Sequence, residues 1–396
     1  MQNERYSGFN LFVLNVNKSS VCVQTGKRGL TAVAHVCLML LPLLPFYCKA
    51  VNVPSPPQPL ATWDATGRAT TGFGYRENVL RSSIDQENGA FFNTSADVSL
   101  MRFLESGAYM SFFILFDDSQ YFNTPSVDYE RFISATLQAA TPVGTDDELG
   151  GQFNCLYQHQ VIDLSESQSD ISRSLVDGYT YALQPYWKHT LGDGWDVQAE
   201  TELLRQVYSG EISDYWAPAA GLRLIRRYGH RSEVSLYGQT KYLVYDSREK
   251  ADPDGNALAG TSLVYQQNEI GIQWRHTFDK DQQWRTRTKL NYKLSQDNGS
   301  GYFDYHRVQG SQQLRWKNPL WEVKMNACLN WYTYPEQEID NEHYDRYSVV
   351  LDVRIERRLG KRWILYSFAE REWSMSNDER DQYRDWAAGC GAGFEF

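Results

Sequence analysis

Apolar and polar residues alternate one by one along most of the chain after residue 62. In residues 270–275, two isoleucines and a tryptophan alternate with a glycine, a glutamine and an arginine. Residues 284–294 alternate Trp, Thr, Leu and Tyr with Arg, Lys and Asn in the same way. This period of two is typical of a β-strand, whose successive side chains point to opposite faces. No stretch with a helical period appears beyond residue 62, so the chain is predicted to be all-β.

The connections between these segments alternate between short and long. Short ones are expected near residues 106–107, 144–147, 191–194, 229–230, 279–281, 318–319 and 360–361. Long ones are expected near residues 81–87, 121–126, 163–172, 210–214, 246–260, 297–301, 334–343 and 376–381. This pattern predicts a transmembrane antiparallel β-barrel of about 16 strands, within a range of about 14 to 18, with its short turns at one end. None of the long connections is long enough to predict a large constriction loop folded into the barrel.

The tryptophans fall at two heights along the predicted strands. Those at the other rim, beside long loops, are Trp216, Trp331, Trp373 and Trp386. The larger group lies next to the short turns and is predicted to mark a membrane interface: Trp187, Trp195, Trp274, Trp284, Trp316, Trp321 and Trp363. Two aromatic belts are typical of a barrel that crosses a bilayer. A soluble β-sandwich, the alternative that alternation alone leaves open, has no reason to sort tryptophan by height.

The N-terminal part of the chain has a different pattern. Residues 30–47 are almost entirely apolar, follow Lys27 and Arg28, and precede Cys48 and Ala50, which is the layout of a cleavable secretory signal. A membrane anchor and a lipidated Cys48 are the alternatives. The predicted division is a leader at 1–50, a Pro-rich periplasmic lead-in at 51–61 and the barrel at 62–396. Three cysteines would remain, which is too few for a disulfide framework.

The last strand carries a further signal. Aromatic and small residues from Trp386 onward alternate with glycines, and the chain ends on Phe394, Glu395 and Phe396. This ending resembles the C-terminal strand of outer-membrane barrels, which the barrel-assembly machinery reads, and the resemblance makes Phe394 and Phe396 the assembly signal. Over residues 62–396 the layout resembles bacterial porin-like barrels. The resemblance implies the outer membrane of a Gram-negative bacterium as location and its lipids as surroundings.

Composition narrows the remaining classes. The chain has 396 residues, of which 42% are hydrophobic and 14% aromatic, and its mean hydropathy is -0.55. That average is too polar for a helical membrane protein. The net charge of -10 argues against a nucleic-acid partner, which requires a clustered basic face.

The polar faces of the strands would point inward, where so many polar side chains require water. A barrel of about 16 strands is wide enough for an aqueous channel. Seven bases are predicted to line it: Arg275, Arg285, Arg287, Lys289, Arg307, Arg315 and Arg354. They would favour anions, so we predict a passive pore for small polar or anionic solutes. The alternative is that the bases brace the wall by pairing with Glu269, Glu322, Asp352 and Glu356.

Two other function classes remain open. An export conduit for polysaccharide or another envelope component would use the same barrel, with a separately encoded periplasmic partner. A barrel enzyme acting on lipids would need a nucleophile, a base and an orienting group at one height, but the histidines are scattered. No phosphate loop, zinc spacing or calcium loop appears, so neither a cofactor nor a metal is expected. A homo-oligomer is possible.

Overall fold

The structure is a computed structural model that describes residues 63–84, 86–164, 173–210, 212–229, 231–339 and 341–396. The predicted leader at 1–50, with Cys48, and the lead-in at 51–61 lie outside these residues. Within them, no helix is both long and apolar enough to cross a membrane.

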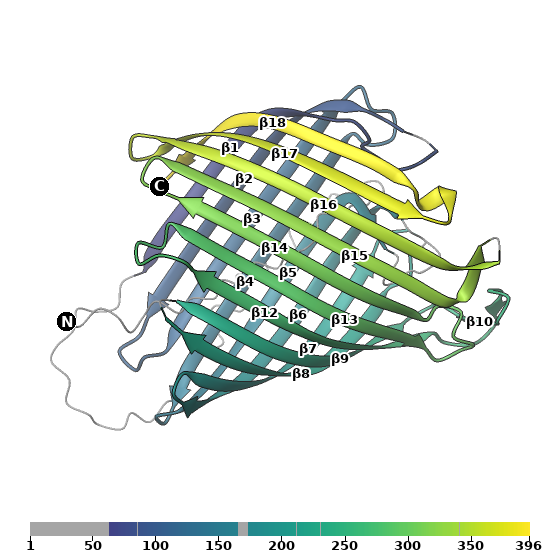
Figure 1. Cartoon of the computed structure of the whole chain (residues 1–396), viewed down its shortest axis with the longest axis horizontal. Coiled ribbons are helices and arrows are strands. Elements are labelled where there is room, and N and C mark those ends of the chain that lie inside the picture. Colours follow the sequence, from purple (N-terminus) through teal and green to yellow (C-terminus); the bar gives the residue numbers. More distant parts are fainter. Residues whose placement is uncertain (1–62, 85, 165–172, 211, 230, 340) are drawn as a thin grey trace.

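Sixteen strands form one closed barrel (Figure 1). They are β1 (Asp64–Arg76), β2 (Gly89–Phe103), β3 (Tyr109–Phe122), β4 (Tyr129–Val143), β5 (Asp147–Asp163), β6 (Arg173–Gly192), β7 (Trp195–Tyr208), β8 (Tyr215–Tyr228), β9 (Ser232–Tyr245), β12 (Val264–Thr277), β13 (Trp284–Asp297), β14 (Tyr305–Lys317), β15 (Trp321–Ile339), β16 (Glu342–Leu359), β17 (Trp363–Ser376) and β18 (Tyr383–Glu395). A two-stranded sheet of β10 (Lys250–Ala251) and β11 (Ala257–Leu258) lies in the loop after β9, and a 3₁₀ turn, η1 (Glu379–Asp381), precedes β18. The prediction of an all-β, 16-stranded antiparallel barrel is confirmed.

The barrel closes where β1 pairs with β18. At this point the backbone N–H of Phe396 donates to the carbonyl of Gly67 at 2.9 Å, and the Gly67 N–H donates back at 3.0 Å. The strands approach so closely that a Cβ on Gly391 would lie 2.1 Å from the carbonyl oxygen of Thr71. Only glycine fits there, which explains why the last strand alternates with glycines.

The seven predicted short turns all join strands at one end of the barrel, here named the short-turn end. Seven of the eight predicted long connections join strand ends at the opposite, long-loop end, where the β10–β11 hairpin projects in Figure 1. The predicted long loop at 334–343 is wrong, because β15 continues to Ile339 and β16 starts at Glu342. A β-bulge between Tyr334 and Glu338 accommodates Pro335, which cannot donate a ladder hydrogen bond.

Side chains sort by face as the alternation predicts. On β12, Ile270, Ile272 and Trp274 have 55%, 44% and 41% of their surface exposed, whereas Gln267 and Gln273 have 6% and 5%. The exposed face lies outside the barrel and is apolar. The opposite register carries the polar residues inside, which is the arrangement of a barrel in lipid rather than in water.

Candidate functional site: the barrel lumen

A cavity of about 1090 Å³ occupies the lumen toward the short-turn end. Its lining comes from β2 to β9 and from β12 to β14, together with the turn residues Gly107, Gly229 and Arg231. Amides of Gln152 and Gln184 face it alongside charged side chains. The cavity is therefore a wide polar vestibule rather than an apolar ligand pocket.

Acids on one side of the vestibule are matched by nearby bases. Glu148 on β5 pairs with Lys188 on β6 at 2.7 Å. Glu200 and Glu202 on β7 pair with Arg223 and Lys241, at 3.8 and 2.6 Å respectively. Opposite charges held this close largely cancel for a solute passing at a distance.

Five of the seven predicted pore-lining bases also lie beside a carboxylate. The pairs are Arg275 with Glu233, Lys289 with Glu269 at 3.5 Å, Arg307 with Glu269 at 3.3 Å, Arg315 with Glu322 at 2.9 Å, and Arg354 with Glu356 at 2.7 Å. Lys289, Arg307, Arg315 and Arg354 thus pair with acids that the wall-bracing alternative named, whereas Arg275 pairs with Glu233, which it did not name. Asp352, which the alternative also named, accepts a hydrogen bond from the Asn326 amide at 2.6 Å.

Arg285 and Arg287 differ from the other five. Arg287 Nη2 donates to the amide oxygen of Gln273 at 3.0 Å, and Arg285 Nη2 donates to that of Gln282. Among the described residues, no carboxylate oxygen lies within 4.0 Å of either guanidinium. An amide oxygen satisfies a donor without neutralising its charge, so these two positive charges have no ion-pair partner in the cavity wall.

The seven bases are not brought into one place. Arg275, Arg285, Arg287, Lys289 and Arg315 border the vestibule. Arg307 is only 6% exposed and Arg354 stacks on the Tyr366 ring with 4.1 Å to the centroid, so neither borders it.

Three arginines of the vestibule were missed in the sequence: Arg223 and Arg227 on β8, and Arg231 in the following turn. Arg223 and Arg227 are four residues apart, so a period of two places them on one face. That signal could have identified them. Arg231 follows the strand at a left-handed backbone position, φ 56°, and no periodicity predicts its direction.

The lumen toward the long-loop end is packed rather than open. Tyr245, Tyr265 and Phe303 form one buried cluster with residues of the loop after β9. A second cluster joins Tyr305, Tyr332, Tyr334 and Tyr344 where β14, β15 and β16 meet. Tyr265 and Tyr305 are both 0% exposed. These tyrosines therefore act as packing residues beneath the loops and do not line an open channel.

The connection between β1 and β2 crosses this end of the lumen. Val79 is 0% exposed and packs with Val127 and Val161. Arg81 Nη1 donates to the carbonyl of Val161 on β5 at 2.9 Å, and its Nε lies 3.3 Å from a carboxylate oxygen of Glu372 on β17. Five strands separate β5 from β17 around the barrel. Residues 77–84 and 86–88, here named the strap, therefore bridge two distant walls. A folded-in constriction was not expected from the loop lengths.

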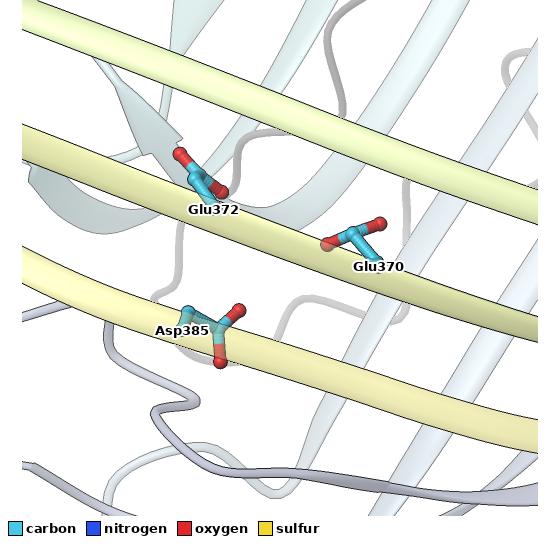
Figure 2. Close-up of side chains that lie close together, drawn as sticks. All are labelled: Glu370, Glu372 and Asp385. Carbon is cyan, nitrogen blue, oxygen red and sulfur yellow. The ribbon is translucent and has the colours of Figure 1, made fainter. Parts of the chain in front are cut away.

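The strap is anchored by a group of three carboxylates, Glu370, Glu372 and Asp385 (Figure 2). One oxygen from each lies within 4.8 Å of the others. Arg76 contacts Glu370 at 2.6 Å and Asp385 at 3.6 Å, and Arg81 contacts Glu372. Because the arginines already supply positive charge, the group is an ion-pair network that holds the strap rather than a cation site.

The predicted interface tryptophans lie on the outer surface near the short-turn end. Trp195, Trp284, Trp321 and Trp363 are the first residues of β7, β13, β15 and β17. Trp187 and Trp274 precede short turns and are each 41% exposed. Trp316 pairs with Trp284 across β13 and β14, with ring centroids 6.0 Å apart.

The two C-terminal phenylalanines lie at the same end. Phe394 makes an edge-to-face contact with Trp363 at 5.2 Å, and Phe396 is 61% exposed.

The barrel is similar to several solved structures, all with low sequence identity. CdiB from Acinetobacter baumannii gives a TM-score of 0.43 at 10% identity, with 84% of this chain and 60% of that chain covered, so the chain spans about 60% of the length of CdiB. OprB from Pseudomonas putida gives 0.46 at 10% identity, with 84% and 94% covered. A bacterial polysaccharide outer membrane secretin gives 0.42 at 8% identity, with 84% and 97% covered.

No family model matches the chain, and no curated protein matches it in sequence. The strands themselves decide the fold. It is a closed antiparallel β-barrel with an apolar outer face, the architecture of a barrel that crosses a membrane.

Proposed function

We propose that the chain is an outer-membrane channel for small polar solutes and that it prefers anions. The observation that carries the proposal is the contrast in the vestibule wall. Five of the predicted bases face carboxylates, whereas Arg285 and Arg287 face the amides of Gln282 and Gln273. Uncompensated arginines in a channel wall favour anions, and low-dielectric walls extend their effect across the lumen.

The size of the solute follows from the long-loop end. The strap and the tyrosine clusters occupy the lumen there, which supports passage of small solutes rather than of a polymer. Export of a polysaccharide, the alternative, would require the strap to leave its buried contacts with Val161 and Glu372. For this reason we place the export function second.

One serine–histidine pair bears on a possible enzymatic role. Ser232 Oγ lies 3.3 Å from Nδ1 of His276 near the short-turn end. The serine is 3% exposed and already accepts the Thr277 N–H at 3.1 Å. Among the described residues, no carboxylate lies within 4.0 Å of His276 to orient it as a base. The pair lacks the geometry of an activated nucleophile, so we propose no catalytic function.

The outer surface supports the remaining partners. We propose that the exposed tryptophans near the short turns contact lipid at one membrane interface. We also propose that Phe394 and Phe396 present the assembly signal. Replacing Phe396 with Asp should reduce the amount of barrel recovered in outer membranes, whereas replacing the similarly exposed Phe278 should not.

Reversal potential in a KCl gradient across a planar bilayer tests the channel proposal. The wild type should prefer chloride, and the double variant Arg285→Gln, Arg287→Gln should lose most of that preference. The matched control, Lys361→Gln with Arg362→Gln, removes two charges from a short turn that does not border the vestibule and should keep it. A barrel that inserts but conducts nothing, or a wild type that prefers potassium, would contradict the proposal.

A further inference from the structure

Gln282 lies in the turn between β12 and β13, at the short-turn mouth of the vestibule. Its amide oxygen accepts hydrogen bonds from two guanidiniums, Arg231 Nη1 at 2.6 Å and Arg285 Nη2. Both arginines border the vestibule. One neutral oxygen thus bridges two positive groups, one from the turn between β8 and β9 and one from the start of β13.

We propose that Arg231 and Arg285 form a binding site for an oxyanion of the phosphate type, whose oxygen would take the place now held by the Gln282 amide. This inference rests on the proposed function, because the same wall would carry anions through the vestibule. It goes further because it names a discrete site and a class of solute, the polyatomic oxyanions, to which chloride does not belong.

The chemistry of the two side chains favours an oxyanion. A guanidinium offers parallel N–H donors that match two oxygens of a phosphate, and hydrogen bonds to a charged acceptor are about twice as strong as those to a neutral one. Arg285 also has a donor to spare, because its Nε is buried and has no hydrogen-bond partner among the described residues. A multidentate anion would satisfy more donors than the single amide oxygen does.

Neither arginine of the site is neutralised by an ion pair. Arg315 lies directly opposite Arg285 on β14 and pairs with Glu322. In the turn itself, Asp279 accepts the backbone N–H of Trp284 at 3.4 Å. No described carboxylate lies within 4.0 Å of the guanidinium of Arg231 or of Arg285. An incoming anion would therefore not have to displace a carboxylate from either side chain.

Gln282 and Arg231 are both held by unusual backbone conformations. Their φ angles are 57° and 56°, in the left-handed region that residues other than glycine rarely adopt. Two turns with such conformations meet at one amide oxygen. Local strain of this kind persists where the surrounding structure holds it, and it often marks a functional site.

Inhibition of chloride current by inorganic phosphate tests the proposal. With ionic strength held constant, phosphate added on the short-turn side should reduce the wild-type current in a saturable way. Gln282→Glu places a carboxylate between the two guanidiniums and should raise the half-inhibiting concentration at least tenfold. Gln283→Glu is the matched control: it adds the same charge one residue further along the turn and should change that concentration less than threefold.

Two further variants separate the effect of the competing amide oxygen from the effect of the guanidinium charge. Gln282→Ala removes the competing oxygen and should lower the half-inhibiting concentration, whereas Arg231→Gln should raise it. Non-saturable inhibition in the wild type, or equal effects of the two glutamate variants, would overturn the site. A wild-type channel with no chloride preference in plain KCl would instead contradict the proposed function. The failure of the site and the failure of the proposed function are therefore distinguishable. A gel-mobility shift on heating checks that each variant is folded.

Discussion

The two ends of the lumen use the same strands in opposite ways. Toward the short turns, inward side chains such as Arg287 and Glu200 surround an open vestibule. Toward the long loops, inward tyrosines such as Tyr265 and Tyr305 are fully buried. Strand periodicity is the same in both halves, so what differs is what the connections place in the lumen. The short turns leave the vestibule open, whereas the strap and the loop after β9 pack their side chains against the inward face.

This contrast separates stability from selectivity. Buried aromatic clusters and the strap network concentrate apolar burial and ion pairing at the long-loop end. The uncompensated charges lie in the other half, where water keeps their cost low. Each half can therefore be altered without losing the function assigned to the other, and this is the basis of the predictions.

The largest effect is expected from releasing the strap. Arg81→Ala removes the contacts with Val161 and Glu372, so the strap should leave the lumen and single-channel conductance should rise several-fold. Removing one partner of a buried ion pair costs about 3–5 kcal/mol, so the variant should also unfold more readily in urea.

Arg380→Ala is the matched control for that change. Arg380 lies at the same end and pairs with Asp378 at 2.5 Å, but its side chain is 76% exposed. It should leave both conductance and stability unchanged. If Arg81→Ala also left conductance at the wild-type value, the strap would not be what narrows the channel.

An intermediate effect is expected from the tyrosine clusters. Tyr265 contacts Tyr245 and Phe303 edge-to-face, with ring centroids 5.6 and 6.2 Å away. Truncation of a buried aromatic to alanine costs about 3–5 kcal/mol, so Tyr265→Ala should lower the free energy of unfolding by that order. Arg287→Gln, in the open half, should change it by less than about 0.5 kcal/mol. If urea titrations showed equal losses of unfolding free energy for the two variants, the two halves of the lumen would not differ in stability.

The smallest effect concerns pH at a long loop. Burial, together with the nearby carboxylates of Asp297 and Glu336, raises the pKa of Asp304 in the loop between β13 and β14 to about 6. A carboxyl whose pKa is higher in the folded state binds its proton more tightly there. The ordered loop is therefore stabilised as the pH falls from about 7 toward 4.

Hydrogen exchange of residues 298–304, corrected for intrinsic rates, should show more protection at pH 5 than at pH 7.5. Asp304→Asn should remove the difference. The vestibule residues at the other end should show no matching change, and protection that falls on acidification would contradict the assignment.

The strands and turns could be predicted from the sequence because both depend on local chemistry. Alternation identifies the inward register of Arg285 and Arg287, and turn residues identify the short-turn end. What alternation cannot give is the partner of each base. Arg275 meets Glu233 only because β12 pairs with β9, across the β10–β11 hairpin. Bases that pair with a carboxylate and bases that do not therefore look alike in the sequence.

The strap could not be predicted for a related reason. Arg81 contacts Val161, 80 positions away, and Glu372 on a strand near the C-terminus. Loop length predicted nothing folded into the lumen, because the strap is held by an arginine with distant partners and not by its size. Buried long-range ion pairs leave no periodic signal in a sequence.

Polymer exclusion measured separately from the two sides of an oriented bilayer tests the asymmetry most directly. Polyethylene glycols of graded size enter an aqueous channel and reduce its conductance until they become too large. The largest polymer that still reduces conductance should be larger at the short-turn side than at the long-loop side. Arg81→Ala should bring these two size limits closer. The same size limit from both sides in the wild type would contradict an open vestibule at one end and a packed lumen at the other.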